Sequence, residues 1–148
     1  MQDMEKFSES LGTQINLAAR WMRSALEKEL TDEGITPSQW MLIMALGENE
    51  HLMQTELGKI VNIDNATITR SLDKLQEMSL IVRNQDKDDR RAQHVSLTEK
   101  GHEAYKVWNT IGRKINQHAS KSISPVEKRS LLKLLGMIID NLNGADIE

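Results

Sequence analysis

The fold of this chain is decided by residues 63–101, which read IDNATITRSLDKLQEMSLIVRNQDKDDRRAQHVSLTEKG. In the first part of this stretch, Ile68, Leu72 and Leu75 recur at the spacing of one face of a helix. The polar residues on the other face are Asn65, Thr67, Thr69 and Arg70. Their side chains are donors and acceptors of the size that DNA base edges require, and Lys74 lies one turn further on, where it would meet a phosphate.

The second part of the stretch predicts a two-stranded ribbon. Residues 80–83 and 94–97 form the two strands, residues 86–91 form a charged tip, and a new helix starts at Thr98. A polar-faced helix beside a ribbon with arginines at its tip suits a surface that contacts duplex DNA in two grooves.

The residues before this helix have the spacing of a helix-turn-helix over about residues 54–78. Gly58 allows two helices to cross closely, and Asn62 tolerates the left-handed backbone that the turn needs. Ile63 can fill the core between the helices, and Asp64 or Asn65 caps the second one.

The chain ends add amphipathic helices. We expect one over residues 4–30, a second from the capping box Thr36-Pro37-Ser38-Gln39, and helices over residues 101–143, the last starting at Ser124-Pro125-Val126-Glu127. The last helix is apolar over more than one face, which predicts a symmetric dimer built from residues 4–30 and 101–143. A fully interior helix in a monomeric bundle is the alternative.

Composition limits the class of protein. A chain of 148 residues with 39% apolar and 28% charged residues is most simply one folded domain. There is no cysteine, no apolar run long enough for a membrane span and no signal-peptide pattern, so we expect a cytoplasmic protein without membrane association. The net charge of −3 argues only mildly against nucleic acid, because residues 64–100 are neutral as a segment.

Two runs resemble the winged-helix regulators of the multiple antibiotic resistance regulator (MarR) family, especially its SlyA-like branch. They are residues 65–75 (NATITRSLDKL) and residues 88–101 (DDRRAQHVSLTEKG), and the helix start from Thr36 to Trp40 also fits. The similarity covers about residues 5–142. It implies a mostly α fold with a small β-hairpin wing over residues 82–97, inside a DNA-binding lobe of residues 36–100 flanked by helical dimerisation regions.

The resemblance also implies a transcriptional repressor that binds a pseudo-palindromic operator as a homodimer. Residues 65–78 would be the recognition helix in the major groove, and Arg91 would enter the minor groove, held by an ion pair with Asp89. Arg90 would reach phosphate or the groove edge. Two positions depart from the family pattern: Ser79 replaces a glycine after the recognition helix, and Met53 replaces the usual Ser or Thr cap.

Family likeness further suggests release from DNA by a small aromatic or phenolic effector. The candidate lining residues are Arg20, Trp21, Trp40, Tyr105 and Trp108. For tryptophans on helices, packing in the core is the commoner role.

Other classes of function have less support. The chain carries none of the short motifs of hydrolases, nucleotide-binding loops or zinc proteases, so we expect no enzyme activity and no cofactor. A metal-responsive regulator of the same fold is an alternative, but the four histidines are scattered and predict no metal site. A helical interaction module that does not bind DNA is a third possibility, which leaves the tip arginines without a role.

Overall fold

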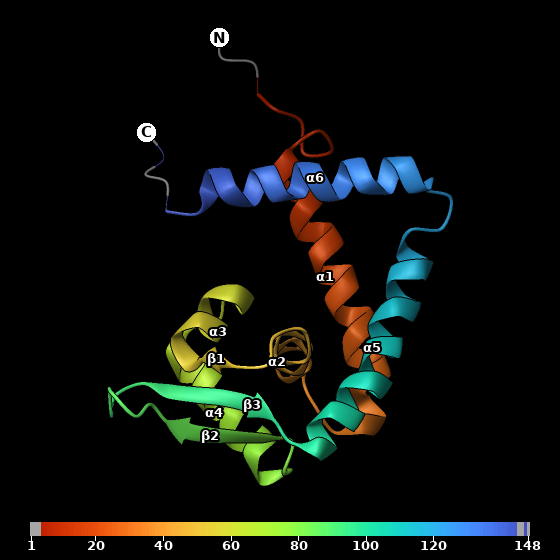
Figure 1. Ribbon diagram of the computed structural model, residues 1–148. Coiled ribbons are helices and arrows are strands. Elements are labelled where there is room, and N and C mark those ends of the chain that lie inside the picture. The colour runs from red at the N-terminus through yellow and green to blue at the C-terminus, as the bar shows by residue number, and fades with distance from the viewer. Residues whose placement is uncertain (1–3, 145–146, 148) are drawn as a thin grey trace. The chain divides into compact units, whose positions relative to one another are not determined.

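The computed structural model describes residues 4–144 and 147. The chain divides into two compact units between Ile115 and Asn116. The first unit contains most of the elements, and the second contains the end of one long helix and the last helix (Figure 1).

Seven helices, one of them a short 3-10 helix, and three strands make up the described part of the chain. In order they are α1 (Leu11–Leu30), the 3-10 helix η1 (Thr31–Glu33), α2 (Pro37–Glu48), β1 (Leu52–Met53), α3 (Gln54–Val61), α4 (Asn65–Glu77), β2 (Ile81–Gln85), β3 (Gln93–Leu97), α5 (Glu99–Ala119) and α6 (Pro125–Leu142). The predicted fold class, mostly α with a small β wing, is confirmed, and none of the described helices is long and apolar enough to cross a bilayer.

The first helix is shorter than the sequence predicted. It begins at Leu11 rather than at residue 4, because Ser10 takes an extended backbone and its hydroxyl accepts from the Thr13 N–H at 3.5 Å. Before it the chain turns, with the Ser10 N–H donating to the Lys6 carbonyl at 3.0 Å. A serine that caps the backbone competes with helix continuation, and the periodic pattern of apolar residues did not reveal this.

The predicted capping boxes are confirmed at two other helix starts. At α2 the Gln39 N–H donates to the Thr36 hydroxyl at 3.2 Å, and the Thr36 N–H donates to the Gln39 side chain at 3.0 Å. Ser124 and Glu127 repeat this reciprocal pair at α6, at 3.2 and 2.8 Å.

The helix-turn-helix has the expected turn. Asn62 ends α3 with a left-handed φ of 49°, and Asp64 caps α4 by accepting from the Thr67 N–H at 2.9 Å. A Cβ added to Gly58 would lie 3.2 Å from Cδ1 of Ile68, so the two helices meet closely at this glycine. Met53 gives α3 no side-chain cap, but its N–H donates to the Glu56 carboxylate at 2.8 Å, which caps the helix from the other side.

The core of the first unit lies under this motif. The fully buried side chains come from α1, α2, α3, α4 and the sheet; they are Leu30, Leu42, Ile43, Leu46, Leu57, Ile68, Leu72, Leu75, Ile81 and Val95. Because α4 and the sheet share this core, the polar face of α4 and the hairpin are positioned by the same set of contacts.

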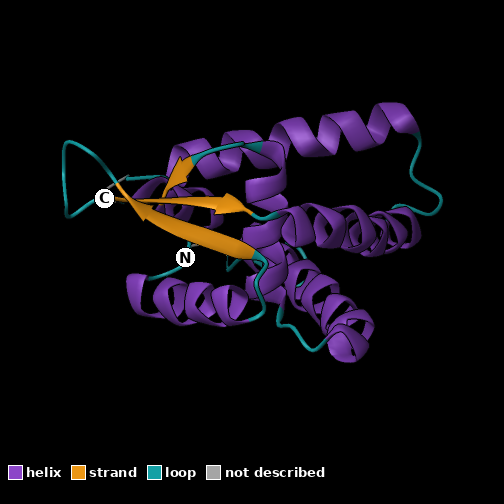
Figure 2. Cartoon of the chain, turned by 60° about the horizontal axis from the view of Figure 1, so that its bottom comes forward, coloured by secondary structure: helices purple, strands orange, loops and turns teal. Residues whose placement is uncertain are grey.

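The sheet has three strands rather than the two that the sequence predicted. The order is β1-β3-β2, all antiparallel, with Leu52 paired to Val95 and Asn84 paired to His94. Strand β1 has only two residues, which is too few for an alternating pattern, so the sequence did not predict this strand or its pairing. The hairpin of β2 and β3 ends in the loop of residues 86–92, which extends beyond the strands (Figure 2).

The junction after α4 has a left-handed backbone at Ser79, a conformation that is strained for a residue other than glycine. Ser79 has φ of 62°. Its carbonyl accepts from the Thr98 hydroxyl at 2.6 Å, and the neighbouring Met78 carbonyl accepts from Lys100 Nζ at 2.8 Å. Gly101 packs against the same junction, because a Cβ there would overlap the Leu80 carbonyl oxygen. These contacts tie the end of α4 to the start of α5 and hold the turn in place.

Candidate nucleic-acid interface

The outer face of α4 carries the polar residues that the sequence singled out. Asn65, Thr69, Arg70 and Lys74 are exposed, whereas Thr67 is half-buried. The Thr67 hydroxyl donates to the Asp64 carboxylate at 2.7 Å, so this threonine contributes to the helix cap. Hydrogen bonds from Thr67 lower the pKa of Asp64, which keeps the cap ionised at the positive end of the helix.

The loop between β2 and β3 exposes the two predicted tip arginines, Arg90 and Arg91. The predicted ion pair between the Asp89 and Arg91 side chains is not among the contacts of the described residues. Both residues are described, and Asp89 Oδ1 instead accepts from the backbone N–H of Arg91 at 3.0 Å. In the loop, a short carboxylate reaches the nearby backbone more easily than the end of the arginine side chain.

Helix α4, the hairpin and the junction between β1 and α3 line one shared hollow of about 650 Å³. Its lining residues are Met53, Gln54, Thr55, Asn65, Thr69, Arg83, Asp89, Arg91, Ala92 and Gln93. Of the predicted DNA-binding residues, the hollow therefore brings together Asn65, Thr69, Asp89 and Arg91. Thr67, Arg70, Lys74 and Arg90 do not line it.

Arg83 was missed as a functional residue by sequence reasoning. It lies on β2, and its guanidinium reaches across to α4, donating to Asp73 Oδ1 at 2.5 Å and to Gln76 Oε1 at 2.7 Å. Its side chain is only 18% exposed. A signal was available in the sequence. Asp73 and Gln76 are three residues apart, which places them on the same side of the helix, and the strand that follows carries the cation Arg83.

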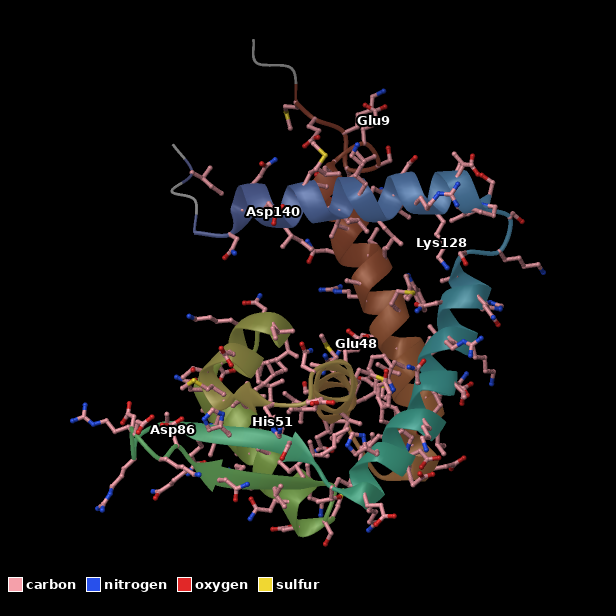
Figure 3. All side chains as sticks on the ribbon, in the orientation of Figure 1. Glu9, Glu48, His51, Asp86, Lys128 and Asp140 are labelled. Atoms are coloured by element: carbon pink, nitrogen blue, oxygen red, sulfur yellow. The ribbon has the colours of Figure 1, made fainter. Side chains whose placement is uncertain are left out.

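The base of the tip loop is held by Asp86, which Figure 3 labels at the end of β2. Its Oδ1 accepts from the N–H groups of Asp88 at 2.8 Å and Asp89 at 3.1 Å, and its Oδ2 lies 2.6 Å from Nε2 of His94. The hydrogen bond from His94, followed by those from the two backbone N–H groups, lowers the pKa of Asp86 to about 2.

The predicted effector-lining residues are not gathered into one site. Trp40 Nε1 donates to the Trp108 carbonyl at 3.0 Å, and Trp108 Nε1 donates to Glu33 at 3.0 Å with the ring buried. Tyr105 packs so closely on Gly47 that a Cβ there would overlap its ring. Arg20 and Trp21 are exposed on α1, so three of the five residues serve packing and two face solvent.

Within residues 4–144, together with residue 147, no cluster of three or more His, Asp or Glu side chains could hold a metal ion.

Comparison with known proteins gives a family match over the region just described. The sequence model of the MarR family matches residues 35–92, which run from just before α2 to the end of the tip loop. The uncharacterised HTH-type transcriptional regulator YdgJ of Bacillus subtilis is 28% identical over 113 residues, covering 76% of this chain and 69% of YdgJ. The HTH-type transcriptional regulator SarZ of Staphylococcus epidermidis is 30% identical over 86 residues, covering 58% of each chain.

Solved structures share the fold over nearly the whole chain. A MarR-family transcriptional regulator from Silicibacter pomeroyi superposes with a TM-score of 0.86 at 23% identity, covering 96% of both chains. A mutant of MarR from E. coli in complex with operator DNA gives 0.77 at 24% identity, covering 87% of this chain and 93% of that one. BpsR of Bordetella bronchiseptica, whose DNA binding is regulated by 6-hydroxynicotinic acid, gives 0.83 at 23% identity, covering 97% and 99%. Similarity to the SlyA structure, at 25% identity, does not single out a SlyA-like branch.

Proposed function

We propose that the protein is a sequence-specific repressor of the MarR family that binds a pseudo-palindromic operator as a homodimer, a proposal supported by the match of the family model to residues 35–92 and by the similarity to SarZ. The function is regulatory rather than catalytic, as in the relatives named above.

The observation that carries this proposal is the hollow shared by α4 and the hairpin. Asn65 and Thr69 from α4 line the same surface as Arg91 and Gln93 from the hairpin. One compact unit therefore offers hydrogen-bonding groups on a helix and a cation on a projecting loop, which is the pairing that two adjacent grooves of a duplex require.

In the proposed complex, α4 lies in the major groove. Asn65, Thr69 and Arg70 contact base edges, and Lys74 contacts a phosphate. Arg91 enters the neighbouring minor groove, where the negative potential of a narrow groove attracts an arginine, and Arg90 contacts the backbone beside it.

The proposed dimer rests on apolar surface that a single chain leaves exposed. In α6 no residue is buried, and Leu131, Leu132, Leu134, Met137, Ile139 and Leu142 are each 46–65% exposed. A helix with this much apolar surface is typical of an interface between subunits. Two copies of α4 would then read half-sites about 34–36 Å apart.

A small aromatic acid is the proposed effector class. BpsR, which has a similar fold, is regulated by 6-hydroxynicotinic acid. In this chain Arg20 is an exposed cation on α1, which would attract such an anion. Release follows if the effector binds the DNA-free dimer more tightly than the DNA-bound one.

The test is selection of duplexes of roughly 30 base pairs from a random library, long enough for two half-sites. We expect one inverted-repeat sequence to be enriched and to bind in fluorescence anisotropy with an affinity that falls steeply with salt. Failure to enrich any sequence, with binding to random duplex no stronger than that of an unrelated acidic protein, would contradict the proposal.

A further inference from the structure

The tip loop of residues 86–92 carries both exposed arginines of the hairpin. A loop that is ordered only on contact with DNA loses conformational freedom at that moment, and this loss weakens binding. A loop that is already ordered in the free protein avoids the loss. The contacts that order this loop therefore bear on DNA affinity, although they need not contact DNA themselves.

Asp86 makes most of these contacts. Its carboxylate receives the N–H groups of Asp88 and Asp89 on one oxygen, and Nε2 of His94 on the other. The Asp86 N–H also donates to the Ala92 carbonyl at 2.9 Å, which closes the loop at its base. A single side chain thus joins the outgoing strand, the first turn of the loop and the returning strand.

The strand register explains why Asp86 and His94 meet. Asn84 and His94 are directly paired in the β2–β3 ladder. Asp86 lies two residues beyond Asn84, so its side chain is on the same face and is the diagonal neighbour of His94. Both side chains are partly covered, at 27% exposure for Asp86 and 38% for His94.

The negative charge of Asp86 allows its effect on loop order to be distinguished from its electrostatic effect on DNA binding. Asp86 is an anion at neutral pH, as its lowered pKa requires, and it lies in a loop whose proposed partner is a polyanion. Its charge alone opposes DNA binding. If Asp86 positions the loop, removal of its carboxylate should instead weaken DNA binding, because the loop that presents Arg90 and Arg91 would become looser.

We propose that Asp86 and His94 form a positioning pair, which holds the tip loop in its DNA-binding shape before DNA arrives, so that an acidic residue raises the affinity for DNA. This inference rests on the proposed function, because it concerns how the hairpin enters the minor groove.

The test compares Asp86→Ala with Asp88→Ala. Both substitutions remove one negative charge from the same loop. The Asp88 carboxylate makes no hydrogen bond or ion pair with any residue of the described ranges, so its removal reports charge alone. The probe is the duplex selected by the wild-type protein, labelled with fluorescein. We expect Asp86→Ala to weaken binding by about three- to tenfold, and Asp88→Ala to leave it unchanged or tighter.

His94 provides a second arm that does not alter the loop itself. His94→Ala removes the donor to Asp86, whereas His94→Gln keeps an N–H donor at a similar reach. We expect His94→Ala to weaken binding and His94→Gln to restore most of the affinity. The double variant Asp86→Ala/His94→Ala should bind no more weakly than Asp86→Ala, because both changes remove the same contact.

Hydrogen exchange of the free protein gives a readout that DNA does not influence. In Asp86→Ala the amides of Asp88 and Asp89 should exchange faster, while the amides of α4 keep their wild-type rates. An Asp86→Ala protein that binds as tightly as Asp88→Ala would overturn the positioning pair and leave the proposed function standing. A wild-type protein that selects no duplex would overturn the proposed function itself.

Discussion

At the scale of single residues, Arg91 combines exposure with a place in the hollow beside α4. We predict that Arg91→Ala weakens DNA binding by at least ~1 kcal/mol, because a cation in a narrow groove is lost. The matched control is Lys87→Ala, which removes one positive charge from the same exposed loop, outside the hollow. Anisotropy titrations check this, and equal losses for the two variants would reduce Arg91 to a general electrostatic contact.

Asp86 gives a second prediction at this scale, on stability against pH. Its pKa is lowered from 3.8 to about 2 in the folded protein, mainly by the hydrogen bond from His94. A group with a lowered folded pKa stabilises the native state above its unfolded pKa and loses that effect as the pH falls through the folded value. Thermal unfolding between pH 5 and about 2 should therefore show the wild-type protein losing its advantage over Asp86→Asn as the pH falls. A difference that stays constant over this range would contradict the assignment.

The sequence patterns predicted many of these residues, but they did not predict all of the groups that these residues contact. Local rules predicted the cap at Asp64 and the left-handed turn at Asn62, because both depend on a few consecutive residues. For Asp89 the sequence predicted the Arg91 side chain, whereas the structure shows the Arg91 backbone N–H, and the partners of Arg83 and Asp86 were not predicted at all. The contacts of Arg83 with α4 and of Asp86 with His94 depend on the packing and register of the hairpin, which residue spacing does not specify. The bond from the Arg91 N–H to Asp89 is local and forms within the loop.

At the scale of elements, Arg83 joins the hairpin to α4 through Asp73 and Gln76. A double-mutant cycle of Arg83→Ala and Asp73→Ala in urea unfolding should give a coupling of about 0.5–1 kcal/mol, limited because Asp73 is half exposed. We expect Arg83→Ala also to weaken DNA binding, since the angle between hairpin and helix is then less fixed.

The control for this coupling is the pair Lys74–Glu77 on α4, which lies 3.6 Å apart with both side chains more than half exposed. Its cycle should give less than about 0.5 kcal/mol. If both cycles gave the same small value, Arg83 would be an ordinary surface cation and not a brace between elements.

The sequence predicted one helix start correctly and another incorrectly. The start of α2 was predicted from Thr36 to Gln39 and is confirmed. This prediction was possible because a capping box depends only on residues that are close in sequence. Helix α1 was predicted to begin at residue 4 and begins at Leu11, although apolar residues continue at helical spacing before it. Periodicity reports which face would be buried in a helix, whereas the cap at Ser10 decides where the helix starts.

At the scale of the whole molecule, the prediction concerns the state of association. Leu132 and Ile139 are seven residues apart on α6, so they share a face, and they are 59% and 65% exposed in the single chain. Leu132→Asp should cost little stability in a monomer, because this side chain is more than half exposed in the single chain. In a dimer it places a charge in an apolar interface and should shift the protein to monomer in sedimentation velocity.

The control is Asn141→Asp, which adds the same single negative charge at an exposed position of the same helix. We expect it to leave both the dimer and the DNA affinity unchanged. Leu132→Asp should lose the preference for the inverted repeat over a single half-site, because one subunit reads only one half-site. A wild-type protein that sediments as a monomer at micromolar concentration, or a Leu132→Asp variant that keeps the wild-type sedimentation coefficient, would remove α6 from the proposed interface.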